Sequence, residues 1–112
     1  MKIGIVIYSN DSEAISNALD LANYAQQQGD KVNVFLIGKG VEAPTLSKTE
    51  GYARQPFKIT EHIKKLIDNG GQIFASGKCL EFRDLGLPDL CVISSMQNLY
   101  AMIKESDKVI TF

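Results

Sequence analysis

Two cysteines are the side chains of this 112-residue chain with the clearest capacity for covalent chemistry. Cys79 follows a short apolar run and the turn Ser76-Gly77-Lys78, and Arg83 comes four residues later. This pattern places Cys79 in the first turn of a predicted helix, where backbone amides and neighbouring cations stabilise a thiolate. Cys79 is therefore a candidate nucleophile; the alternative is that it fills a helix start without reacting.

Cys91 lies in the apolar run Leu90-Cys91-Val92-Ile93, which predicts a small buried side chain inside a strand. The two cysteines do not form a C-x-x-C pair, so neither a zinc knuckle nor a redox dithiol is predicted. The lone histidine, His62, stands beside charged residues on the polar face of a predicted helix, where we expect it to be solvated. We therefore predict no metal and no cofactor.

The chain alternates short apolar runs with helical patterns, which is typical of an α/β fold with a parallel sheet. The first two runs are apolar on both faces, as in strands that helices cover on both sides. Five strands are predicted, and they lie at residues 2–8, 32–37, 72–75, 90–93 and 108–112. No change in composition marks a boundary, so we expect one domain over residues 1–112.

Apolar residues at helical spacing predict helices between these strands. The expected N-caps are Asp11 or Ser12 for the first helix, Thr60 for a middle one, and Ser94 or Ser95 for the last. Residues 42–57 contain two prolines and a glycine and show no sustained period. We expect a mobile loop there, with room for a short helix at residues 44–48.

Charge and hydropathy disfavour two classes of partner. The chain has 12 basic and 13 acidic residues and a net charge of −1, so we expect no electrostatic attraction to nucleic acid. The first apolar run is far shorter than the roughly 20 residues that span a bilayer, so no membrane segment is expected. Only two cysteines and no secretion signal favour a reducing, cytoplasmic setting.

Ligands of open parallel sheets bind at the carboxyl ends of the strands. Acidic residues after the first strand disfavour a flavin phosphate site, and a serine after the third disfavours a phospho-acceptor aspartate. The run Gly38-Lys39-Gly40-Val41-Glu42-Ala43 fits the outline of a dinucleotide loop, but Pro44 follows where a long helix is required. Of the site types considered at these strand ends, chemistry at a cysteine is the one that the residues favour.

Several segments, in order along nearly the whole chain, resemble the DsrE/DsrF-like (YchN-like) family of small sulfur-relay proteins. They are Glu50-Gly51-Tyr52, the turn from Gly77 to Arg83, and the ending Ser106-Asp107-Lys108-Val109-Ile110-Thr111-Phe112. The resemblance implies a three-layer α/β/α sandwich with about five parallel strands. It also implies a homo-oligomer, either a trimer or a hexamer, and sulfur donor and acceptor proteins as partners.

By position, Cys79 matches the family cysteine that carries a persulfide. Many relatives have a second cysteine where this chain has Ser76, and a glycine where it has Asp84. A single thiolate is nevertheless enough for persulfide carriage. The residues that the resemblance and the local charge pattern suggest as supports for Cys79 are Lys78, Arg83, Ser76, Gly77 and Tyr52.

The leading hypothesis is a small oligomeric sulfur carrier, or sulfurtransferase-like protein, that holds sulfane sulfur on Cys79 and passes it to a partner thiol. The alternative is a non-catalytic module that keeps the fold and binds a small anion or nucleotide, or that serves only in assembly. The sequence does not distinguish catalytic turnover from stoichiometric carriage.

Overall fold

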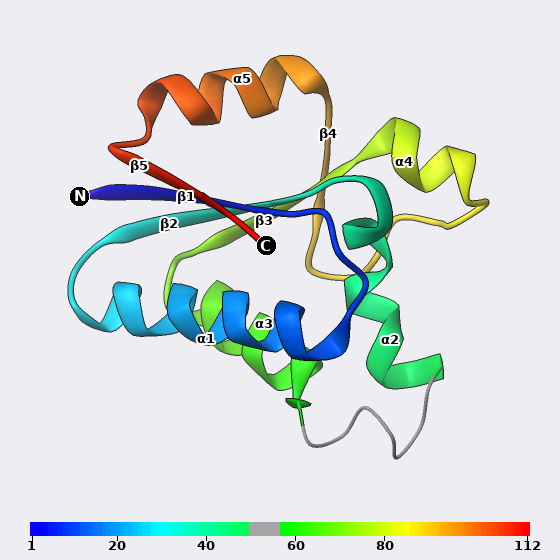
Figure 1. Cartoon of the computed structure of the whole chain (residues 1–112), viewed down its shortest axis with the longest axis horizontal. Helices are drawn as coiled ribbons and strands as arrows, with labels where there is room; N and C mark the ends of the chain where they lie inside the picture. The colour runs from blue at the N-terminus through cyan, green and yellow to red at the C-terminus, as the bar shows by residue number, and fades with distance from the viewer. Residues whose placement is uncertain (50–56) are drawn as a thin grey trace.

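A five-stranded parallel sheet forms the centre of the molecule in a computed structural model that describes residues 1–49 and 57–112 (Figure 1). The spatial order of the strands is β4-β3-β2-β1-β5, and every neighbouring pair is parallel. The strands are β1 (Lys2–Ile7), β2 (Lys31–Leu36), β3 (Gln72–Ser76), β4 (Val92–Ser94) and β5 (Lys108–Thr111). The predicted parallel sheet is confirmed.

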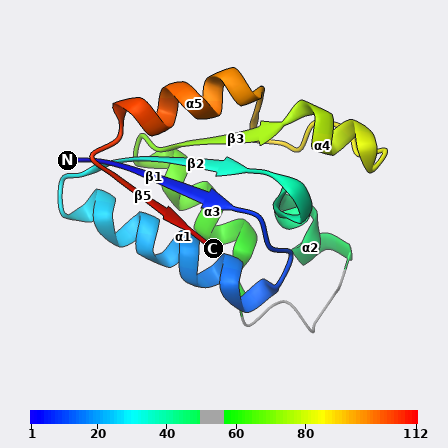
Figure 2. The same cartoon turned by 45° about the horizontal axis from the view of Figure 1, so that its top comes forward.

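Helices cover both faces of this sheet, which makes the fold the expected three-layer α/β/α sandwich (Figures 1 and 2). Helices α1 (Ser12–Gln27) and α3 (Ile59–Asp68) lie side by side on one face, where Asn23 donates a hydrogen bond to the His62 carbonyl. Helix α5 (Met96–Glu105) lies on the other face. In the described residues, no helix is long and apolar enough to cross a membrane.

The larger apolar core lies between the sheet and the α1–α3 layer. Helix α1 begins at the cap Asp11, whose carboxylate accepts from the Ala14 amide, and its apolar residues follow helical spacing, so one face is buried. The fully buried side chains of this core include Ile5, Ile7, Ile15, Leu19, Leu36, Ile59, Leu66 and Ile73. Under α5 the buried cluster is much smaller and consists of Val6, Phe35, Leu99 and Met102.

The carboxyl ends of the parallel strands meet at one edge of the sheet, and short helices start there (Figure 2). Strand β2 leads into the 3-10 helix η1 (Gly38–Glu42) and then α2 (Ala43–Thr49). Strand β3 leads into α4 (Gly77–Phe82), and β4 leads into α5. This edge holds the candidate site.

Three local predictions were wrong. The helical segment extends over residues 42–49, beyond the 44–48 expected, because buried Val41 and Leu46 anchor it and Pro44 lies in the first turn of α2, where proline is tolerated. The short helix expected at residues 44–48 is confirmed, while the rest of the expected loop, residues 50–56, lies outside the described residues.

The other two errors concern where elements begin. Helix α3 begins after Lys58, so Thr60 is inside its first turn and is not its cap. Strand β4 begins at Val92 rather than Leu90, because Leu90 has a φ of 68°, a left-handed conformation that a strand does not accommodate. At α5 the structure selects Ser95 as the cap, with Asn98 completing a capping box.

Candidate functional site

Ser76 ends β3 and fixes the start of the helix that carries Cys79. Its side chain is buried, and its hydroxyl oxygen accepts a hydrogen bond from the Cys79 amide, with a nitrogen-to-oxygen distance of 3.3 Å. This is the N-cap geometry of α4, and it puts Cys79 in the first helical turn, as predicted. Ser76 therefore has a structural role as the cap of this helix.

The Cys79 thiol is half-buried and has a backbone partner from the segment that follows β2. The amide of Gly38, the first residue of η1, donates a hydrogen bond to Cys79 Sγ across 3.3 Å. A hydrogen bond of this kind is stronger when the sulfur carries negative charge. The sulfur therefore lies where the structure can stabilise negative charge.

Two glycines shape the turn that supplies this amide. Gly38 has a φ of +54°, in the left-handed region that favours glycine. At Gly40 there is no room for a side chain, because a Cβ would stand 2.0 Å from the Ile7 carbonyl oxygen. The glycines of the dinucleotide-like run Gly38–Ala43 are thus explained by a tight turn pressed against β1, which leads into the seven-residue α2 rather than a long helix.

Arg83, at the C-terminal end of α4, is held by two hydrogen bonds. Its Nε donates to Glu42 Oε2 across 3.2 Å, and its Nη1 donates to the Cys79 carbonyl oxygen across 3.2 Å. Both partners of the Arg83–Glu42 ion pair are partly buried. The guanidinium is therefore directed to η1 and to the backbone of the cysteine.

A cavity of about 650 Å³ lies beside the thiol. Its walls come from residues 76–79 at the start of α4 and residues 93–98 at the start of α5. Lys78 lines it and is exposed, and Ile93 and Met96 supply apolar surface. Gly77 packs closely on the Ile93 side chain, which a Cβ at this position would approach to 3.2 Å.

Cys91 differs from Cys79 in its burial. Both are free thiols, but Cys91 is buried in the larger core. Burial, with a smaller contribution from the Asp89 carboxylate, raises its pKa from 9.0 to about 11. Cys91 is thus a small core side chain, as the sequence indicates, although it directly precedes β4 and is not inside it.

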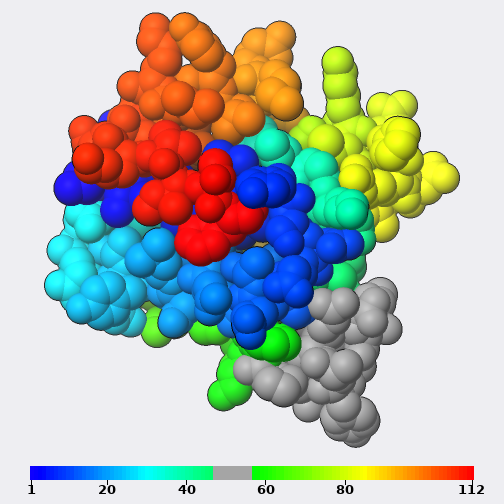
Figure 3. All heavy atoms as spheres, in the orientation of Figure 1, coloured from blue at the N-terminus to red at the C-terminus, as the bar shows by residue number. Residues whose placement is uncertain are grey.

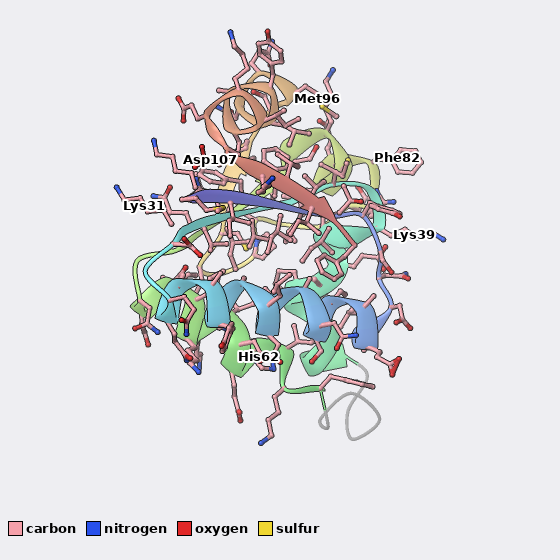
Figure 4. All side chains as sticks on the ribbon, turned by 60° about the vertical axis from the view of Figure 1, so that its left-hand side comes forward. Lys31, Lys39, His62, Phe82, Met96 and Asp107 are labelled. Atoms are coloured by element: carbon pink, nitrogen blue, oxygen red, sulfur yellow. The ribbon has the colours of Figure 1, made fainter. Side chains whose placement is uncertain are left out.

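The remaining candidates lie apart from the thiol or cannot be placed. His62 is half-buried on α3, which belongs to the layer opposite α5 (Figure 4). Among the residues that the structure describes, no group of His, Cys, Asp and Glu could hold a metal ion. Tyr52, expected over the site or at a subunit boundary, lies outside the described residues.

Sequence reasoning missed two residues at the site, Gly38 and Glu42. Both were considered in the dinucleotide-like run Gly38–Ala43, and Glu42 also as the start of a loop, but neither was connected with Cys79. The signal that could have found them is the order of the sheet: β2 and β3 are neighbours, so the residues after β2 adjoin the residues after β3.

Comparisons with known proteins agree with this fold. An uncharacterised protein of Methanocaldococcus jannaschii, MJ0989, is 33% identical over 103 residues, which cover 89% of this chain and 88% of the relative. The crystal structure of the ychN protein from E. coli superposes with a TM-score of 0.81 at 26% identity and covers 100% of this chain and 99% of that one. A conserved protein of unknown function from Bacteroides thetaiotaomicron, BT1422, shares the fold at a TM-score of 0.75 and 16% identity, over 99% of this chain and 94% of its own.

The family-level match spans the described elements and the segment between them. The model of the DsrE/DsrF-like family matches residues 1–112. Together with the curated relative, this match shows that the chain belongs to the DsrE/DsrF-like family.

Proposed function

We propose that this protein carries sulfane sulfur as a persulfide on Cys79 and passes it to a partner thiol. The observation that carries the proposal is the placement of Cys79 Sγ: half-buried, at the carboxyl edge of the sheet, and bonded to the Gly38 amide. Membership of a family generally associated with sulfur relay supports the same chemistry.

The loading step is a displacement at sulfur. The Cys79 thiolate attacks the outer sulfur of a donor persulfide, R–S–SH; the new S–S bond forms as the donor's S–S bond breaks, and R–S⁻ leaves. In the release step, an acceptor thiolate attacks the outer sulfur of the Cys79 persulfide and regenerates the Cys79 thiolate. Atoms and electrons balance over the two steps, so no oxidant or reductant is required.

Because residue 76 is a serine, no neighbouring thiol at that position can discharge a persulfide on Cys79. In a C-x-x-C protein the second thiol can attack the first sulfur and discharge the persulfide as a disulfide. A serine hydroxyl cannot do so, and Cys91 is a buried core residue. The persulfide would therefore persist until an acceptor from another protein reaches the cavity beside Cys79.

The second copy of this chain is the partner that the surface favours. Apolar side chains are exposed on α5 and on the two edge strands of the sheet, β4 and β5. They are Val92, Ile93, Met96, Tyr100, Ile103, Val109 and Ile110. Figure 3 shows the atoms of β5, in red, lying at the surface between α5 and α1. Burial of this surface between copies would give the trimer or hexamer that we propose for the working protein.

Mass spectrometry of the intact protein tests the sulfur chemistry directly. After exposure to a small-molecule persulfide and removal of the excess, the wild-type protein and the matched control Cys91→Ser should each gain one sulfur atom. Cys79→Ser should gain none. The proposal fails if the wild type gains no sulfur from any donor, or if Cys79→Ser gains as much as the wild type.

The cavity also favours a second candidate function, a non-catalytic module that binds a small anion or nucleotide. Its volume of about 650 Å³ is within the range of ligand pockets in proteins. Such a module would show ligand-induced thermal stabilisation that survives Cys79→Ser, whereas a persulfide carrier loses its loading in that variant.

A further inference from the structure

Helix α4 and η1 are joined at two points, one at each end of η1. At the first residue of η1, the Gly38 amide bonds to Cys79 Sγ. At its last residue, Glu42 Oε2 accepts from Arg83 Nε, and the same arginine donates to the carbonyl oxygen of Cys79. Glu42 therefore belongs to a closed circuit of contacts that begins and ends at the cysteine.

The turn between these two points is short and stiff. A bond from the Gly40 amide to the Ile37 carbonyl closes it, with a distance of 2.8 Å, and Val41 is fully buried. The other carboxylate oxygen of Glu42 lies 3.5 Å from Asn10 Nδ2, on the segment that follows β1. Because few torsions separate Glu42 from Gly38, holding one end of the turn limits where the other end can move.

From this circuit we infer that Glu42 is a positioning residue for Cys79: its ion pair with Arg83 holds η1 against α4 and keeps the Gly38 amide on the sulfur. Neither the family match nor the proposed persulfide chemistry assigns a role to Glu42. The inference deepens the proposed function, since a correctly placed donor would stabilise both the attacking thiolate and the same thiolate as leaving group.

The sign of the effect separates positioning from simple electrostatics. A carboxylate near a thiolate repels it, so loss of the Glu42 charge by itself would increase the thiolate fraction. Loss of the Glu42 acceptor would instead release Arg83 and η1 and decrease that fraction. Glu42→Gln removes the charge and keeps an acceptor oxygen, whereas Glu42→Met removes both at similar side-chain length.

The experiment measures the rate of Cys79 alkylation by iodoacetamide across pH in the Cys91→Ser background, so that one thiol reports. At neutral pH we expect Glu42→Met to react about fivefold more slowly than Glu42→Gln, which is the worth of one hydrogen bond. The pH at which alkylation reaches half its maximum should be higher in the methionine variant. Equal rates and equal midpoints in the two variants would overturn the inference.

Arg83→Met tests the same contact from the other side. If the two residues act as a pair, Arg83→Met slows alkylation, and the double variant with Glu42→Met is no slower than either single one. Effects that multiply in the double variant would mean that Arg83 acts on the sulfur without Glu42, and the inference would fall. If Glu42→Met does not fold, Glu42→Ala replaces it in both comparisons.

Failure of this inference is distinguishable from failure of the sulfur chemistry. Alkylation needs no sulfur donor, so a protein that never loads sulfur can still show the dependence of Cys79 on Glu42. A protein that loads sulfur equally well in all the Glu42 variants, with unchanged alkylation, would keep the proposed function and lose the positioning role.

Discussion

The backbone amide of Gly38 donates a hydrogen bond to Cys79 Sγ across 3.3 Å, although 41 positions separate the two residues in the sequence. The contact exists because β2 and β3 are parallel neighbours whose carboxyl ends open onto the same edge of the sheet. The hydrogen bond joins the glycine-containing turn at the start of η1 to the start of α4, which Ser76 caps. The thiol environment therefore depends on two local structures, and each can be disturbed separately.

The glycine turn is expected to tolerate substitutions unequally. At Gly38, alanine would have to adopt a φ of +54°, which costs about 1–2 kcal/mol of folding free energy. At Gly40, a Cβ would collide with the backbone of Ile7, so we expect a larger loss for Gly40→Ala. Chemical denaturation of the two variants measures both losses.

The matched control for these variants is Gly86→Ala. A Cβ at Gly86 would meet no atom within 4 Å, and its φ is not in the left-handed region, so its stability should change little. If Gly40→Ala were no less stable than Gly86→Ala, the tight approach of η1 to β1 would be contradicted.

The Ser76 cap is expected to contribute to stability as well as to the site. Ser76→Ala removes the acceptor of the Cys79 amide and should lower the free energy of unfolding by about 1 kcal/mol. Urea denaturation provides the measurement. Ser94→Ala is a suitable comparison, because the Ser94 hydroxyl donates a long hydrogen bond of 3.5 Å to the Val92 carbonyl and Ser94 is more exposed than Ser76. Equal losses in the two variants would argue against the cap.

Much of the fold could be predicted from the sequence because its strongest signals are local. The helical spacing of its apolar residues predicts α1, and runs of residues that are apolar on both faces predict strands β1 and β2. The full extent of the helical segment from Glu42 to Thr49 could not, since it depends on burial of Val41 and Leu46 against distant elements. Only the short helix at residues 44–48 was expected there, inside a proline-containing loop.

The candidate site likewise has one part that the sequence predicts and another that it does not. The helix start at Cys79 follows from neighbouring residues, and the structure confirms that placement. The partners of the site, Gly38 and Glu42, are about forty positions away, and no periodicity links them to the cysteine. Arg83 was expected beside the thiolate for its charge, yet the bonds that hold it go to Glu42 and to the Cys79 carbonyl.

Cys91 is expected to make stability depend on alkaline pH. Its pKa is about 11 in the folded protein and 9.0 when unperturbed, so between these values the unfolded chain loses the thiol proton while the folded chain keeps it. The contribution is fully present below pH 9 and is lost as the pH rises through 11. At about 1.4 kcal/mol per pH unit, the loss is at most about 3 kcal/mol.

Comparison with Cys91→Ala isolates this contribution, because tyrosines and lysines titrate in both proteins. The free energy of unfolding of the wild type, measured in urea at several pH values, should fall toward that of Cys91→Ala, or below it, between pH 9 and 11. Curves that stay parallel across this window would contradict the raised pKa of Cys91.

Assembly through the α5 face is expected to depend on Tyr100 and not on its counterpart across the sheet. Tyr100 on α5 and Tyr24 on α1 are almost equally exposed, 63% and 61%, so a glutamate at either position changes hydropathy and charge alike. Met96, also on α5, is exposed as well, so a second copy could cover it. Sedimentation velocity should find a trimer or hexamer for the wild type and for Tyr24→Glu, and smaller species for Tyr100→Glu. A monomeric wild type, or equal dissociation of the two variants, would show that the exposed face of α5 is not where copies of this chain meet.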